Sequence, residues 1–152
     1  MSFKREKDIE PVIQASLRYH FPGKAFIYKT HPDGYEGKGK PDLIGSLLSI
    51  YVGIELKRSP GRPSGHQKEW LKNINAAGGL GVVILWHEAD ECFYLVPPEE
   101  IEGFSYRKRS TKWQVLRHVA FKGRVLVDLR PLRAYLCTRL AQSFAALNGE
   151  ER

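Results

Sequence analysis

Two carboxylates and one amine are spaced in this sequence in a way that could support hydrolysis. Pro41-Asp42 is followed, after twelve residues, by Glu55-Leu56-Lys57. Because side chains alternate along a strand, Glu55 and Lys57 would project from the same face of a strand. If Asp42 begins the neighbouring strand, its carboxylate meets them at one place.

This set of groups suits phosphodiester chemistry. Paired carboxylates make a hard oxygen site for Mg²⁺, which keeps several waters and takes few protein ligands. A metal in such a site can lower the pKa of bound water and stabilise the charge that develops on a phosphate. Lys57 would position or help deprotonate the attacking water, or neutralise the transition state. We therefore expect Mg²⁺ as the cofactor, with Mn²⁺ as the alternative.

The elements that must position these groups follow from hydrophobic periodicity and from turn residues. A long loop rich in proline and glycine is expected at 31–41. Helices are expected at 4–19, at 64–77 before the Gly78-Gly79 turn, and at 131–147. Strands are expected at 25–28, 42–45, 49–57, 81–86, 92–96 and 124–127, with a short helical turn starting at Pro97-Pro98.

The order αβββαβ predicts an α/β fold with a mixed central β-sheet flanked by helices. Residues 81–86 are apolar on both faces, which is typical of a central strand covered on each side. With 152 residues, the chain is expected to form a single domain over 1–152. Its core would span about 4–97 and a basic C-terminal extension about 98–152.

The positive charge is concentrated in that extension. The net charge is +7, yet residues 1–100 hold 13 Lys and Arg against 13 Asp and Glu, whereas residues 101–152 hold 11 against 4. Such a surface binds phosphates and releases counterions, so we expect DNA as the partner. A merely solvated basic face is the alternative. The best candidates for phosphate contacts are Arg107, Lys108, Arg109 and Lys112.

Other classes of protein are disfavoured by the sequence. No apolar stretch approaches the roughly 20 residues that span a bilayer, and the N-terminus lacks the apolar segment of a signal peptide. We therefore expect no membrane partner and a cytoplasmic location. Cys92 and Cys137 lack the spacing of a zinc site, and both are expected to be buried.

The motif and its neighbours resemble the PD-(D/E)XK nuclease superfamily, which implies a restriction-endonuclease-like core. Two branches are similar. The VRR-NUC domains are matched by Gly39-Lys-Pro-Asp42-Leu-Ile-Gly45, Ile54-Glu-Leu-Lys57, Gln67, Trp70-Leu71 and Ala77-Gly78-Gly79. The RecU-type Holliday junction resolvases are matched over most of the chain, through Ile9-Glu10, Ile13-Gln14, Ala25-Phe-Ile-Tyr-Lys29, His66-Gln67, Tyr94-Leu95, Arg109-Ser110 and Pro131-Leu-Arg-Ala-Tyr-Leu136.

The resemblance implies further site residues. Glu10 aligns with the family's helix carboxylate and would join Asp42 and Glu55 at the metal, although Glu6, one turn earlier, is the alternative. Gln67 resembles the glutamine next to the active site. Lys29 and Lys40 are candidates for contact with the DNA backbone. RecU-like proteins also carry an inserted stalk, for which residues 31–40 leave no room.

The favoured hypothesis is a Mg²⁺-dependent endonuclease that cuts four-way DNA junctions. Two opposed cuts related by a two-fold axis would require a homodimer. One alternative is a VRR-NUC type nuclease acting on flaps, single strands or other replication intermediates. The other is a non-catalytic DNA-binding module, against which the complete set of Asp42, Glu55 and Lys57 argues.

Overall fold

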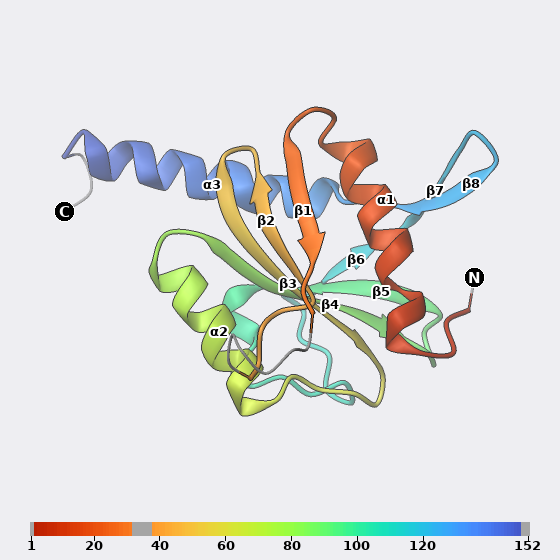
Figure 1. Cartoon of the computed structure of the whole chain (residues 1–152). Coiled ribbons are helices and arrows are strands. Elements are labelled where there is room, and N and C mark those ends of the chain that lie inside the picture. Colours follow the sequence, from red (N-terminus) through yellow and green to blue (C-terminus); the bar gives the residue numbers. More distant parts are fainter. Residues whose placement is uncertain (1, 32–37, 150–152) are drawn as a thin grey trace.

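A computed structural model describes residues 2–31 and 38–149, and Figure 1 shows how the elements are arranged. Residues 32–37 of the expected loop lie outside this range. The helices are η1 (Glu6–Asp8), α1 (Glu10–His20), α2 (Gly65–Ala76), η2 (Pro98–Glu100) and α3 (Arg130–Leu147), where η marks a 3₁₀ turn. The strands are β1 (Ala25–Lys29), β2 (Leu43–Leu47), β3 (Ile50–Arg58), β4 (Leu80–His87), β5 (Cys92–Val96), β6 (Gln114–Leu116), β7 (His118–Phe121) and β8 (Arg124–Val127).

The main sheet has six strands in the order β1-β2-β3-β4-β5-β6. Only β3 and β4 pair in parallel within it, and α2 makes the crossover between them, as parallel neighbours require. The other neighbours pair antiparallel. The sheet is therefore mixed and flanked by helices, which confirms the predicted fold class. The side chains of β4 are buried along its whole length, as expected of a covered central strand.

Each face of the sheet has its own apolar core. Ile13 and Leu17 of α1 pack into the first core, and Leu132 and Leu136 from the start of α3 join them. Leu71 of α2 belongs to the second core on the opposite face, to which the extension contributes Phe104. Because the basic extension supplies residues to both cores, it packs against the sheet that carries the site. The C-terminal end of α3 projects beyond the sheet (Figure 1).

The first helix begins later than predicted. Residues 6–8 form the separate turn η1, and α1 starts at Glu10. Pro11 lies in the first turn of α1, where its missing N–H costs nothing, but inside a longer helix it would remove a hydrogen bond. A continuous helix over 4–19 was therefore the wrong prediction, and Glu6 and Glu10 lie on different elements.

Strands β6 and β7 were not predicted from the sequence. The predicted strand at 124–127 is confirmed as β8, but its partner β7 was not foreseen. Lys122 and Gly123 both have positive φ values, of 47° and 74°, as a tight two-residue hairpin turn requires. The Lys-Gly pair between two apolar runs was the available signal.

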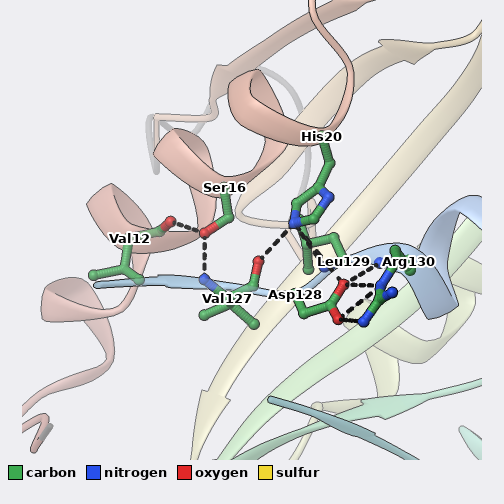
Figure 2. A network of polar contacts seen from close by, with 7 residues as sticks. All are labelled: Val12, Ser16, His20, Val127, Asp128, Leu129 and Arg130. Carbon is green, nitrogen blue, oxygen red and sulfur yellow. Dashed lines mark hydrogen bonds and ion pairs between the residues drawn. The ribbon is translucent and has the colours of Figure 1, made fainter. Parts of the chain in front are cut away.

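A polar network fastens the C-terminal extension to α1 (Figure 2). Ser16 Oγ donates to Val12 O at 2.7 Å and accepts from Val127 N at 2.9 Å. His20 Nε2 lies 3.1 Å from Val127 O and 4.0 Å from Asp128 Oδ1. The network holds the start of α3 next to α1.

Among the described residues, no helix is long and apolar enough to cross a membrane. Cys92 is only partly buried and Cys137 is exposed on α3, so the expected burial of both was wrong. Periodicity could not reveal which side of α3 meets the sheet.

Candidate active site

The β2-β3 pair brings Asp42 to Glu55. Leu43 lies opposite Ile54 in the antiparallel register, so one step further Asp42 faces Glu55. The backbone N–H of Leu56 donates to Asp42 Oδ2 at 2.7 Å, which orients the carboxylate. Strand alternation therefore unites the two acids, as the motif predicted.

The two oxygens of the Glu55 carboxylate differ in their contacts among the described residues. Its side chain is only 1% exposed. Gln67 Nε2 donates to Oε1 at 2.9 Å, and Lys57 Nζ lies 3.1 Å from the same oxygen. The other oxygen, Oε2, is buried and has no hydrogen-bond partner among the described residues. A buried carboxylate oxygen is costly unless something binds it, so this atom is suited to a ligand from outside the chain.

The electrostatics at Glu55 lead to the same inference. Burial and the neighbouring Asp42 carboxylate raise the pKa of Glu55 to about 9, although the Lys57 ammonium opposes the shift. Burial outweighs the ion pair because desolvation penalises the charged carboxylate strongly. Because the raised pKa keeps Glu55 protonated at neutral pH, a cation bound beside Asp42 and Glu55 would offset the cost of ionising this buried carboxyl.

Glu6, rather than Glu10, reaches this cluster. Glu6 Oε1 lies 3.8 Å from Lys57 Nζ, and Glu6 Oε2 accepts from Arg58 N at 3.2 Å. A Cβ on Gly61 would lie 2.8 Å from Glu6 Oε2, so a side chain there would crowd the carboxylate. Within residues 2–31 and 38–149, no hydrogen bond or ion pair joins Glu10 to the site. The proposed role of Glu10 stays a prediction, and the contacts favour the alternative, Glu6.

The start of α2 places Gln67. Ser64 and Gln67 form a capping box, in which Gln67 N donates to Ser64 Oγ at 3.2 Å and Ser64 N donates to Gln67 Oε1 at 2.8 Å. The amide therefore has its oxygen bound to the helix cap and its nitrogen free to donate to Glu55. Ser64 was not predicted as part of the site, but the spacing Ser-x-x-Gln before a helix was a usable signal.

This chain is similar to known proteins. Holliday junction resolvase RecU of Mycoplasmopsis pulmonis is 30% identical over 117 residues, which cover 67% of this chain and 74% of the relative. The chain belongs to the RecU family. No family model matches it. Among solved structures, it is similar to the Holliday junction resolvase Hjc of Archaeoglobus fulgidus, with a TM-score of 0.42, 18% identity, and coverage of 68% of this chain and 84% of that one.

Membership of the RecU family confirms the predicted resemblance within the PD-(D/E)XK superfamily. In this RecU-family chain, no group of three or more His, Cys, Asp or Glu side chains among the described residues gathers closely enough to hold a metal. Mg²⁺ needs fewer, because it is commonly bound by one or two carboxylates together with waters and substrate phosphates. Asp42 and Glu55, whose Oε2 has no hydrogen-bond partner in the described part of the chain, fit that requirement.

Three of the predicted basic residues of the RecU-family chain remain available for DNA. Arg107, Lys108 and Lys112 are exposed, and Arg107 lines a hollow of about 430 Å³ together with Pro60 and Arg62. Pro60 and Arg62 belong to the loop that follows β3, so this hollow lies near Lys57.

The other predicted basic residues differ in their surroundings. Arg109 is paired with Asp90 and also donates to Tyr94 Oη at 3.2 Å, so its guanidinium already has partners within the chain. Lys29 is exposed at the end of β1, and Lys40 is half-buried just before Pro41.

Proposed function

We propose that this chain is a divalent-metal-dependent endonuclease that cuts branched DNA, four-way junctions foremost, as a homodimer. The observation that carries the proposal is the buried Glu55 carboxylate, which lies beside Asp42 and leaves one oxygen without a partner among the described residues. Family membership supports the same conclusion, because the RecU relative is named as a Holliday junction resolvase.

Asp42 and Glu55 would hold the metal, Mg²⁺ or alternatively Mn²⁺. When bound, such an ion supplies a Lewis acid and a water of lowered pKa at the scissile phosphate. The register of β2 and β3 keeps the two carboxylates at a constant separation, so the chain provides a preorganised site.

The remaining groups position the reacting atoms and the proposed metal ligand. Lys57 Nζ, held between Glu55 and Glu6, is placed to direct a hydrogen bond to the attacking water or to a phosphate oxygen. Gln67 acts as a positioning residue, because its amide holds the Glu55 carboxylate. Glu6 limits the motion of the ammonium.

The homodimer follows from the reaction rather than from a contact. One site cuts one strand, and resolution of a four-way junction requires two opposed cuts. Two copies related by a two-fold axis supply them symmetrically. The exposed Arg107, Lys108 and Lys112 would bind the phosphates of the DNA arms.

Cleavage with Mg²⁺ or with EDTA tests the proposal. Synthetic four-way junction, flap, single-strand and linear duplex substrates should be compared side by side. We expect metal-dependent cleavage, with the junction cut best and on opposed strands. Preference for a flap or a single strand would favour the VRR-NUC type of activity, and binding without cleavage in any metal would favour a non-catalytic module.

Variants link the activity to the site. Asp42→Asn or Glu55→Gln should abolish cleavage while DNA binding in EDTA is unchanged, or slightly tighter for Asp42→Asn, which removes a negative charge near the phosphate. Glu69→Gln, which changes an exposed carboxylate on α2, is the matched control and should cut normally. Full activity in both site variants would exclude this pair as the metal ligands.

A further inference from the structure

Three aromatic side chains are exposed on one face of the sheet. Phe26 and Tyr28 of β1 are 74% and 49% exposed, and Tyr51 of β3 is 45% exposed. The rings of Phe26 and Tyr28 lie 6.2 Å apart. Burying such rings is strongly favourable, so three exposed rings on one side of a sheet require an explanation. We call Phe26, Tyr28 and Tyr51 the aromatic face.

The aromatic face lies on the same side of the sheet as the candidate active site. Phe26 pairs with Ser46, which in turn pairs with Tyr51, so these side chains form one cross-strand row. Glu55 follows Tyr51 by four residues on the same strand, and strand alternation gives both the same side.

The next rows connect the aromatic face to Asp42. Tyr28 pairs with Ile44 and forms the cross-strand row next to the row of Phe26, Ser46 and Tyr51. The backbone N–H of Thr30 donates to Asp42 O at 2.9 Å, which places Asp42 in the row after that. Successive rows are about 7 Å apart along a strand. The aromatic face therefore begins about one row from the proposed metal ligands.

A hollow extends the aromatic face toward α2. It has a volume of about 410 Å³, and its lining includes Tyr51 together with Trp70 and Ile74 of α2. Trp70 is only partly buried, unlike the tryptophan of β4. The surface thus combines flat rings with a recess beside them.

The charges around the aromatic face favour a polyanion. Strands β1 and β2 and residues 50–54 contain no Asp or Glu, whereas Lys24, directly before β1, is exposed. Lys29, at the other end of β1, is also exposed, although strand alternation gives its side chain the side opposite to Phe26 and Tyr28. A second copy is disfavoured as the occupant, because a two-fold interface would bring in a second Lys24 ammonium with no carboxylate from these strands to pair either one. Nucleic acid supplies both bases that stack on rings and phosphates that attract lysines.

We propose that the aromatic face stacks unpaired bases of the DNA strand next to the cleavage site. This inference rests on the proposed function for the presence of DNA and of a cut at Asp42 and Glu55. It specifies a substrate class in which bases near the branch are unpaired, either in the free DNA or after binding opens the junction.

The test measures DNA affinity in EDTA, where no cleavage occurs. The probes are an oligothymidine strand, a flap, a four-way junction and a linear duplex, and the readout is fluorescence anisotropy. Phe26→Ala combined with Tyr28→Ala should weaken binding to the oligothymidine strand and the flap by about tenfold for each stacked base, and leave binding to the duplex unchanged. Phe26→Trp combined with Tyr28→Phe should restore the affinity, because the rings can still stack.

Phe144→Ala is the matched control, because Phe144 is 70% exposed on α3, away from the aromatic face. It should change none of the affinities. Sedimentation of the same variants reports whether a dimer dissociates. The inference is overturned if the alanine pair weakens all probes equally, weakens none, or dissociates a dimer, the last result assigning the face to a second copy.

The failure of the proposed function gives a different result. If the wild-type chain binds none of the probes and cuts none with metal, the proposed function and this inference fail together. If the wild-type chain binds and cuts while the alanine pair behaves identically, only the inference fails.

Discussion

Gln67 donates an amide hydrogen to Glu55 across the space between α2 and β3, at 2.9 Å. The capping box at Ser64 determines which end of the amide points to the carboxylate. The start of α2 is therefore coupled to the geometry of the proposed metal ligand, as outer hydrogen-bond partners of metal ligands commonly are.

Gln67→Ala should lower the single-turnover cleavage rate by about 10- to 100-fold, the range for removal of a hydrogen-bond partner of a metal ligand. The metal concentration needed for half-maximal activity should rise. Gln142→Ala, at an exposed position of α3, is the control and should behave as wild type. An unchanged metal dependence in Gln67→Ala would show that the amide only caps the helix.

Lys57→Ala should lower kcat by about 10²-fold, as expected when an acid–base or electrostatic group is removed. KM should change little, because the ammonium is occupied by Glu55 and Glu6 in the free protein. Steady-state kinetics measure both, with the exposed Lys72→Ala as the control. If only KM changes, Lys57 binds substrate instead.

Glu6→Gln and Glu10→Gln form a matched pair. Because Glu6 contacts Lys57 and the Arg58 amide, we expect Glu6→Gln to reduce the cleavage rate and Glu10→Gln to leave it unchanged. Cleavage of the junction at saturating metal measures the difference. The reverse result would restore Glu10 as the helix carboxylate of the site.

Arg107, Lys108 and Lys112, replaced together by Ala, should weaken binding to every DNA structure. The slope of log affinity against log salt should fall by up to about 0.9 for each phosphate that these side chains no longer neutralise. Arg109→Ala should instead lower the melting temperature with little change in slope, because its partners are Asp90 and Tyr94. Equal slopes for wild type and the triple variant would mean that these three residues form only a solvated surface.

Asp128 gives a pH dependence of stability. The hydrogen-bonded Arg130 guanidinium lowers the pKa of the Asp128 carboxyl below its ordinary value, although burial opposes the shift. A depressed folded-state pKa contributes stability above the ordinary Asp pKa of about 3.9, and this stability is lost as the pH falls through the folded value. Figure 2 shows the contacts of this carboxylate with Arg130 and His20.

Asp128→Asn should therefore lower the melting temperature at neutral pH, and the difference from wild type should shrink as the pH falls below about 4. Thermal unfolding followed by circular dichroism across pH measures this. Arg133→Ala, which changes an exposed arginine on α3, is the control and should give no such trend. A difference that does not depend on pH would assign the effect to packing rather than to charge.

Local patterns predicted the part of the site that lies on neighbouring strands. Alternation along β3 predicted that Glu55 and Lys57 project from the same side of the strand. The short connection at Leu48 and Ser49 predicted that β2 and β3 pair antiparallel. Both signals act within a few residues. The hairpin at Lys122-Gly123 was equally local, and it was missed because its turn residues were not recognised.

Contacts between distant segments could not be predicted in the same way. Helical periodicity suits both Glu6 and Glu10, and only the packing of η1 against the end of β3 brings Glu6 to Lys57. Arg109 was expected to bind DNA because it is basic, but the fold places Asp90 beside it. Charge along a sequence reports how many cations exist and not which of them are already paired.

The sequence by itself determined the mixed α/β fold, the acid pair at Asp42 and Glu55, and the basic character of the extension, because these follow from periodicity, alternation and composition. Only the tertiary structure decided that Glu55 is buried with one oxygen unpartnered among the described residues, that Gln67 holds the other, and that Phe26 and Tyr28 remain uncovered on the same side of the sheet. The physical reason is that burial and pairing depend on which distant segments come to lie against each strand, and a strand's own residues do not encode its neighbours.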